Sequence, residues 1–364
     1  MNTKRTIDLR SDTITTPTKE MRRAMYEAEV GDDVFREDKP TSLLECYAAE
    51  ILKKEAALFV PTGTFANQLA ILTSCKRGEE VVLSNNSHIL QWESGAPAVI
   101  GAVQLRPVLP SNDYLCWNEI NNVIRHHKGN IHCPDTSLVC IENALAEGNV
   151  QPIDAMKEIF QNCNNEGLSV HTDGARLFNA ATALNIDPHT IAENTDSLMF
   201  CLSKGLGAPV GSLLVGDKYF IEKARRNRKL MGGGMRQVGV LAAPGLIALK
   251  NMRHRLVEDH EKAYQFAKFV NKFEELFEVN LNRTKINIVN VNIKFNQCNS
   301  ELLLLEKLSE LKILALSLEK RQVRFVFSHQ TNDEDFSELL SRFQIVSENI
   351  LLAIRGSGSN YATH

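Results

Sequence analysis

The sequence lacks any apolar run long enough to cross a bilayer, and it lacks a large excess of charge of either sign. A spanning helix needs about 20 predominantly apolar residues, and no stretch of this sequence meets that need. The formal net charge is −3 at pH 7, so no overall basic field would attract nucleic acid or anionic lipid. The strongest basic run, at 223–229, is more typical of a solvated helix face. We therefore expect no membrane partner and no nucleic-acid partner.

Export and metal-binding signals are also missing. Residues 1–9 alternate in charge and contain no hydrophobic segment of the kind that a secretory signal needs. The eight cysteines are scattered without CxxC pairs or metal-type spacing, and the histidines near 126–132 lie in polar, loop-like sequence. Scattered thiols without an export signal fit a reducing compartment. The sequence therefore predicts a cytoplasmic protein with no metal site.

The chain has 364 residues, which favours two domains over one. Between about 60 and 215, short apolar segments alternate with helical patterns, which is typical of an α/β layer built on a mostly parallel sheet. Helices are predicted at 154–164 and 217–229, where Asp154 and Asp217 are placed to cap them. Strands are predicted at 81–83, 98–105, 138–142, 168–172, 197–202 and 211–215, the last as a possible antiparallel edge.

The pattern changes after about residue 237. Residues 238–276 read as long helical sequence with a break near Pro244, and residues 286–295 alternate as a strand with one buried face. Further helices are predicted at 301–312 and 333–350, and a further strand at 322–328. We therefore expect a large α/β domain over 1–250, a smaller α+β domain over 251–355, and a disordered tail over 356–364. The N-terminal segment of the large domain is expected to contribute to the active site.

Two charged side chains follow predicted strands in places where chemistry is expected. Lys204 comes directly after an apolar strand and before Gly205, and a partly desolvated amine of this kind can form a Schiff base. Asp173 stands at the carboxyl end of another strand, where α/β sheets bind ligands, and could keep a pyridine nitrogen protonated. Arg176 could bind a substrate carboxylate in a forked geometry. An exposed loop lysine and a turn-capping aspartate are the alternatives.

Two glycine-containing segments could hold a phosphate. Residues 61–67 place small residues before a helical pattern, where backbone N–H groups can approach an anion; an ordinary capped turn is the alternative. Gly232, Gly233 and Gly234 are flanked by Lys229 and Arg236, and a flexible linker is the alternative there. Taken together, the four features supply a phosphate cradle, a pyridinium partner, an amine and carboxylate-binding arginines for one small ligand.

The chain resembles the L-threonine aldolases of the beta-eliminating lyase group, within the fold type I, aspartate-aminotransferase-like enzymes that use pyridoxal 5′-phosphate (PLP). The resemblance covers nearly the whole chain and is strongest from Ile7 to Gln237. It is carried by Asp8-Leu9-Arg10-Ser11-Asp12-Thr13, Val30-Gly31-Asp32-Asp33-Val34-Phe35, Lys54-Glu55-Ala56-Ala57-Leu58-Phe59, Ser87-His88-Ile89 with Glu93, and the segments 61–67, 173–179, 202–211 and 232–237. It implies a mostly parallel central sheet flanked by helices, with a smaller α+β C-terminal domain.

The resemblance also implies roles at matching positions. Lys204 corresponds to the Schiff-base lysine, Asp173 to the partner of the pyridine nitrogen, and His88 to an imidazole that stacks on the cofactor ring and assists proton removal. The cofactor phosphate would be held by Gly63 and Thr64, and from a neighbouring subunit by Lys229 and Arg236, which implies a homo-oligomer, either a dimer or a homotetramer. The substrate carboxylate would be held by Ser11, Arg176 and Arg324.

The sequence departs from the family pattern at two positions. Leu145 stands where the family has a histidine that contacts the substrate β-hydroxyl, and Trp92 replaces a tyrosine. Both changes affect substrate identity more than reaction class. The predicted reaction is cleavage of a β-hydroxy-α-amino acid, such as L-threonine or L-allo-threonine, to glycine and an aldehyde. A β-eliminating lyase, or a retro-aldolase for bulkier phenylserine-like substrates, is the alternative enzyme, and a catalytically silent PLP-fold binding module is the alternative outside enzymes.

Overall fold

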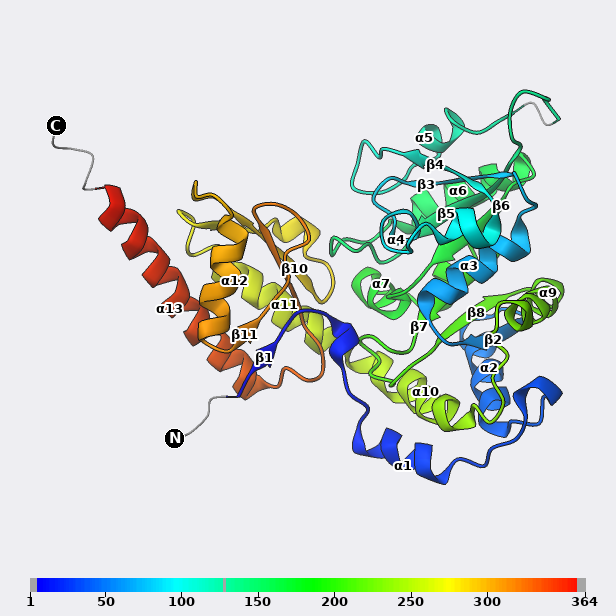
Figure 1. Ribbon diagram of the computed structural model, residues 1–364, viewed down its shortest axis with the longest axis horizontal. Helices are drawn as coiled ribbons and strands as arrows, with labels where there is room; N and C mark the ends of the chain where they lie inside the picture. The colour runs from blue at the N-terminus through cyan, green and yellow to red at the C-terminus, as the bar shows by residue number, and fades with distance from the viewer. Residues whose placement is uncertain (1–4, 127–128, 359–364) are drawn as a thin grey trace. The chain divides into compact units, whose positions relative to one another are not determined.

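The structure is a computed structural model that describes residues 5–126 and 129–358 (Figure 1). The chain forms two compact units. The larger unit comprises residues 15–146 and 150–255, and the smaller unit comprises residues up to 14, 147–149 and those from 256 onward. Among the described residues, none of the helices combines the length and apolar character needed to cross a bilayer.

The larger unit contains a seven-stranded sheet with the strand order β2-β8-β7-β6-β5-β3-β4. The strands are β2 (Ala56–Val60), β3 (Glu80–Ser84), β4 (Gln104–Val108), β5 (Thr136–Glu142), β6 (Ser169–Asp173), β7 (Ser197–Cys201) and β8 (Ser212–Gly216). The run from β4 to β7 is parallel, whereas β8 is antiparallel to both of its neighbours. The sheet is therefore mostly parallel, as the sequence predicted.

The place of β8 differs from the expected edge position. Its antiparallel direction was predicted, but it lies inside the sheet because β2 pairs with its other side. β2 is absent from the predicted strands, although most of its residues fall in the 54–59 motif. All but the first of its residues are buried, and Leu58 and Val60 pack with Leu214 in one apolar cluster. Figure 1 shows β2 and β8 beside α9.

The helices of the larger unit are α1 (Lys19–Glu27), α2 (Lys39–Leu52), α3 (Gly63–Ser74), α4 (His88–Gln91), α5 (Trp117–Asn121), α6 (Ile153–Asn165), α7 (Leu177–Leu184), α8 (Pro188–Ala192), α9 (Lys218–Leu230) and α10 (Gly239–Asn251). The Asp217 side chain caps α9, accepting a hydrogen bond from Phe220 N at 2.6 Å. Asp154 does not cap α6, because the N-cap residue is Pro152. Asp154 lies in the first helical turn, where the negative charge of a carboxylate interacts favourably with the helix dipole.

Two predicted boundaries were wrong for local physical reasons. The predicted strand at 98–105 begins as a π-helical turn over Pro97–Gly101, in which Val99 is 82% exposed, and only β4 pairs in the sheet. The predicted break near Pro244 is absent, since α10 continues through Pro244. The helical sequence is interrupted instead at the 3-10 turn Met252–Arg255, and α11 (Leu256–Val270) follows it.

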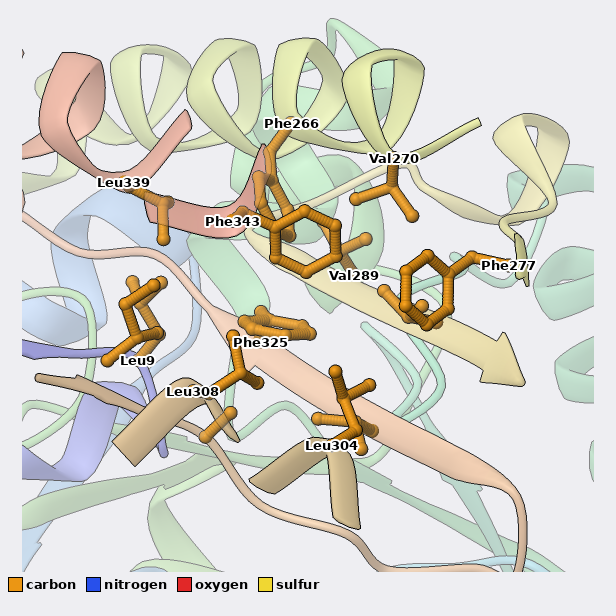
Figure 2. Close-up of a cluster of buried hydrophobic side chains, with 14 of the residues drawn as sticks. Leu9, Phe266, Val270, Phe277, Val289, Leu304, Leu308, Phe325, Leu339 and Phe343 are labelled. Atoms are coloured by element: carbon orange, nitrogen blue, oxygen red, sulfur yellow. The ribbon is translucent and has the colours of Figure 1, made fainter. Parts of the chain in front are cut away.

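The smaller unit is built on an antiparallel sheet of β9 (Phe277–Glu278), β10 (Ile288–Ile293) and β12 (Gln322–Val326). The other helices of this unit are α12 (Ser300–Glu310) and α13 (Asp333–Gly358). Val289, Val291 and Ile293 are buried, while the side chains between them are not, as strand periodicity predicted. Figure 2 shows Phe266, Phe325 and Phe343 meeting in the core of this unit.

The N-terminal segment belongs to the smaller unit, whereas the sequence placed it in the large domain. Strand β1 (Ile7–Asp8) pairs in parallel with β11 (Ile313–Leu314). Leu9 is fully buried in the same apolar core (Figure 2), and its carbonyl accepts a hydrogen bond from Val326 N at 2.8 Å. The segment therefore folds with residues more than 300 positions away. At the other terminus α13 extends to Gly358, and residues 359–364 of the predicted tail lie outside the described residues.

Candidate active site

The predicted site residues of the larger unit converge on one edge of its sheet. Because β3, β6 and β7 are parallel, their carboxyl ends meet at the same edge, and β2 ends there as well. His88 follows β3, Asp173 ends β6, and Lys204 follows β7. Gly63 and Thr64 follow β2 at the beginning of α3. The sheet topology therefore brings together residues from four distant parts of the sequence.

The Asp173 carboxylate is buried and held from two sides. Its Oδ1 accepts a hydrogen bond from Ala175 N at 3.0 Å, and its Oδ2 accepts one from Asn67 Nδ2 at 2.7 Å. The side chain therefore does cap the following turn, as the alternative interpretation expected. It also presents a fixed acceptor at the end of β6. The turn is tight, since a Cβ on Gly174 would lie 2.7 Å from the Met199 carbonyl oxygen.

His88 is fixed by two carboxylates at the beginning of α4. Its backbone N–H donates to Glu142 Oε2, and its ring Nδ1 lies 2.9 Å from Glu93 Oε1. The hydrogen bond to Glu93 raises the pKa of His88, burial opposes the shift, and the Asp173 charge adds to it. The charge of Lys204 lowers the same pKa, so the lysine amine lies near enough to act on the imidazole.

Sequence reasoning missed the buried polar residues that connect these groups. Asn67 donates to Asp173 and to Glu93, and His171 Nε2 lies 3.1 Å from Asn67 Oδ1. The sequence assigns no role to any of the three: Asn67 falls within 61–67, His171 within the predicted strand 168–172, and Glu93 within the motif that contains His88. The available signal was polarity inside apolar sequence: Asn67 is 1% exposed, Glu93 2% and His171 0%.

His88, Glu93 and Asp173 also form the one trio of possible metal ligands found among residues 5–126 and 129–358, with ligand atoms within 4.8 Å of one another. Two of the oxygens are already used as hydrogen-bond acceptors, because Glu93 Oε1 and Asp173 Oδ2 both take the Asn67 amide. The Nδ1 atom of His88 is likewise engaged with Glu93. The donor set is therefore better matched to amide and imidazole N–H groups than to a cation.

His171 predicts an acid sensitivity of folding. Burial lowers its pKa from 6.5 to about 4, so the unfolded chain binds a proton that the folded chain does not. The free energy of unfolding should therefore fall as the pH drops from 6.5 to 4, by about 3 kcal/mol from this residue. Urea unfolding at pH 7 and pH 4 should show a smaller loss for His171→Gln than for the unmodified chain. An equal loss in both proteins would contradict this origin.

Lys204 is half-buried directly after β7. Its carbonyl oxygen accepts hydrogen bonds from Thr15 Oγ1 and Gly207 N, both at 2.9 Å, which fixes the loop. Gly207 has a φ of +76°, a left-handed conformation that favours glycine. The side-chain amine makes no hydrogen bond or ion pair with any residue of the described ranges. Within the described ranges the amine is therefore held by no partner, and its charge acts on His88.

The beginning of α3 lies at the same sheet edge. Thr62 caps α3 by accepting a hydrogen bond from Phe65 N at 3.0 Å, and the N–H groups of Gly63 and Thr64 have no acceptor within the described part of the chain. A Cβ on Gly63 would lie 2.9 Å from both Cys201 Sγ and Met199 Cε. This close approach sets the positive end of α3 against the end of β7, where a phosphate is favoured.

Lys229 and Arg236 surround the glycine-rich turn after α9. Arg236 donates to Asp32 Oδ2 at 2.9 Å, and a Cβ on Gly234 would meet Lys229 Cδ at 2.8 Å. A Cβ on Gly233 would lie 2.4 Å from the Phe65 ring. The glycines therefore permit close packing against the beginning of α3, and the flexible-linker interpretation is wrong for Gly233.

The three predicted carboxylate-binding residues lie in different units. Arg176 is buried at the N-cap of α7 in the larger unit. Ser11 and Arg324 belong to the smaller unit. There, Ser11 Oγ accepts hydrogen bonds from Thr13 N and Thr13 Oγ1, and Arg324 pairs with Asn290 across β12 and β10.

The groups in the larger unit fit PLP by their chemistry. A reactive aldehyde requires an amine, which Lys204 supplies, and a protonated pyridine requires a buried anionic acceptor, which Asp173 supplies. The N–H groups of Gly63 and Thr64, which have no acceptor within the described part of the chain, suit the phosphate. A mostly parallel sheet with these groups at its carboxyl edge defines a fold type I PLP enzyme.

Comparison with known proteins supports and narrows this class. The family model described as Beta-eliminating lyase matches residues 8–294. The chain is 42% identical over 344 residues to Probable low-specificity L-threonine aldolase 2 of Arabidopsis thaliana, covering 93% of this chain and 97% of that protein. It is 46% identical over 258 residues to the Low specificity L-threonine aldolase of Escherichia coli strain K12, covering 71% and 77%. The chain therefore belongs to the beta-eliminating lyase family, alongside the low-specificity L-threonine aldolases, and is a PLP-dependent lyase.

Solved structures show the same fold at lower identity. Threonine aldolase from Leishmania major aligns with a TM-score of 0.81 at 18% identity, covering 93% of this chain and 99% of that one. A structure of SPT with PLP aligns with a TM-score of 0.75 at 16% identity, covering 96% and 89%. These likenesses confirm the predicted fold type I architecture.

Proposed function

We propose that this chain is a low-specificity L-threonine aldolase that cleaves β-hydroxy-α-amino acids, such as L-threonine or L-allo-threonine, to glycine and an aldehyde. The observation that carries the proposal is the placement of Lys204, Asp173 and His88 at one sheet edge. The chain that carries them is 42% identical over most of its length to a probable L-threonine aldolase.

The cofactor, when bound, supplies an electron sink for the pair released as the Cα–Cβ bond breaks. Lys204 would hold its aldehyde carbon, and Asp173 would keep the proton on the ring nitrogen, so that the ring draws electrons strongly. Gly63 and Thr64 would bind the phosphate through N–H and hydroxyl groups. The substrate carboxylate would be fixed by Ser11, Arg176 and Arg324, which orients the bond to be broken.

His88 is proposed to pack on the ring and to accept the β-hydroxyl proton, directly or through water. Since its Nδ1 faces Glu93 at 2.9 Å, Nε2 is the nitrogen left to receive a proton. A raised pKa makes the imidazole a stronger base. Glu93 would also stabilise the imidazolium that forms.

Two side chains favour a second candidate within the same chemistry. Trp92, 55% exposed, follows α4, and the half-buried Leu145 follows β5. Both side chains are apolar where the family pattern has hydrogen-bonding groups. A phenylserine-like substrate would therefore lose less binding free energy from these replacements than threonine would. A β-eliminating activity would use the same cofactor groups. The presence of Lys204, Asp173 and His88 argues against a silent binding module.

One experiment separates these functions. Purified protein should show the visible absorbance of lysine-bound PLP, should change spectrum with glycine, and should release glycine from L-threonine. A kcat/KM more than about tenfold higher for phenylserine, a difference of ~1.4 kcal/mol in transition-state binding, would favour the bulkier substrate. A colourless protein that takes up no PLP would support the silent module and contradict the proposal.

We also propose a homo-oligomer, either a dimer or a homotetramer, in which Lys229 and Arg236 reach the phosphate site of a neighbouring subunit. Large apolar side chains near this turn support a contact with a second copy, since Phe35 is 70% exposed and Leu230 is 77% exposed. A cytoplasmic location is proposed because all eight cysteines are free.

Shared active sites predict complementation between inactive variants. Lys204→Ala removes the amine of its own site, and Arg236→Ala removes the cation that it would lend to a neighbour. A mixed dimer of the two variants should therefore contain one intact site. An equimolar mixture in which subunits pair at random should regain glycine release to roughly a quarter of the unmodified activity. Light scattering should report the assembly. No regained activity in a proven mixed oligomer would contradict shared sites.

A further inference from the structure

A single buried amide lies between two buried carboxylates at the carboxyl edge of the sheet. Asn67 Nδ2 is 2.7 Å from Asp173 Oδ2 and 2.8 Å from Glu93 Oε1. Two carboxylates this close and this buried repel each other. The NH₂ group carries two hydrogens, one for each carboxylate, so the nitrogen of Asn67 has to face them and its oxygen has to face the other way.

His171 fixes that orientation from the opposite side. Its Nε2 lies 3.1 Å from Asn67 Oδ1, and an amide oxygen only accepts, so Nε2 carries the hydrogen. The ring is neutral near pH 7, which leaves Nδ1 as an acceptor 2.9 Å from the Ser197 hydroxyl. The hydrogen bonds therefore all point the same way. The Ser197 hydroxyl on β7 donates to His171 on β6, and His171 donates to Asn67 on α3.

The Glu93 carboxylate connects Asn67 to His88. Glu93 Oε1 accepts hydrogen bonds from the Asn67 amide and from His88 Nδ1, and Glu93 Oε2 accepts one from Gln68 Nε2. Asp173 and His88 are thus joined through Asn67 and Glu93, although Asp173 ends β6 and His88 begins α4. A rotation of the Asn67 amide by half a turn would place its oxygen against both carboxylates and would release both.

We propose that Asn67 and His171 are positioning residues that set the Asp173 carboxylate and the His88 imidazole as one hydrogen-bonded unit. The proposal rests on the proposed function, in which Asp173 meets the edge of the cofactor ring and His88 its face. Neither Asn67 nor His171 needs to touch the cofactor. Their effect would pass through the two groups that do, as outer-shell hydrogen bonds tune the ligands of other cofactors.

The test compares variants of the full-length protein that keep or remove the donor at position 171. His171→Gln retains an N–H near the place of Nε2, whereas His171→Phe removes it, and Asn67→Ala removes the amide. Thr195→Val serves as the matched control, since the buried Thr195 hydroxyl donates to backbone carbonyls of the same sheet but touches none of the network side chains. Three quantities are measured: PLP affinity by absorbance titration, the ring ¹⁵N shifts of His88, and the melting temperature.

Asn67→Ala and His171→Phe should each weaken PLP binding by about tenfold or more and should move the His88 ring shifts. His171→Gln should retain both, and Thr195→Val should lower only the melting temperature. The proposal is overturned if His171→Phe keeps the unmodified affinity and His88 shifts while melting as Thr195→Val does. The comparison of His171→Gln with His171→Phe decides the matter even where Asn67→Ala does not fold.

Failure of the aldolase proposal would look different. A chain that binds PLP but releases no glycine from any β-hydroxy-α-amino acid would contradict the reaction, while the affinities and His88 shifts would still report on the network.

Discussion

Lys204→Ala should abolish turnover of L-threonine, with a loss on the order of 10⁴-fold or more. The amine has no ion-pair partner within the described ranges, and the loop that carries it is fixed by the hydrogen bonds to its carbonyl oxygen. Truncation removes the amine at position 204, so no group remains there to hold the aldehyde carbon. Glycine release and the visible absorbance of the bound cofactor should disappear together.

The matched control is Lys76→Ala, which removes an exposed lysine of the same unit. It should retain both the absorbance and the activity. If Lys204→Ala kept its visible absorbance and its turnover, the assignment of Lys204 as the cofactor-binding lysine would be wrong.

Asp173→Asn should bind PLP yet turn over about 10³-fold more slowly. The neutral amide still offers an oxygen to Ala175 N, which Asp173 now engages at 3.0 Å, and Lys204 still supplies the amine. The amide of Asp173→Asn carries no negative charge to keep the ring nitrogen of the cofactor protonated, so the ring withdraws electrons less strongly. The loss should therefore appear mainly in kcat, with a smaller change in cofactor affinity.

Asp187→Asn is the control for charge removal, because Asp187 is an exposed helix-capping residue and asparagine also caps helices. Steady-state kinetics and PLP titration on both variants separate chemistry from binding. Unmodified rates for Asp173→Asn would contradict the electron-sink role of this carboxylate.

Much of the architecture followed from local pattern. Alternating apolar segments indicate the parallel strands, and Asp173 and Lys204 stand out in the sequence because they fall at the carboxyl ends of two of them. The strand prediction at 98–105 was wrong in its first part, because apolar residues there form a turn and not a strand. Residues 97–101 are apolar but turn in a π-helix with Val99 exposed, and their composition alone resembles a strand.

The links within the site depend on long-range pairing, which periodicity does not reveal. Asn67 and Asp173 are 106 positions apart in sequence, and His171 reaches Asn67 across 104. Nothing in the neighbourhood of Asn67 distinguishes a buried network residue from a helix-capping one until the sheet order places α3 over β6 and β7. Likewise, Leu9 has no local signal for the smaller unit, because its partners lie beyond residue 256.

The most direct test of the central claim is chemical trapping of the lysine–cofactor bond in the purified holoprotein. Borohydride reduction followed by proteolysis and mass spectrometry should place the reduced cofactor on the peptide containing Lys204 and on no other. Cofactor recovered on a different lysine, or on none, would contradict the account.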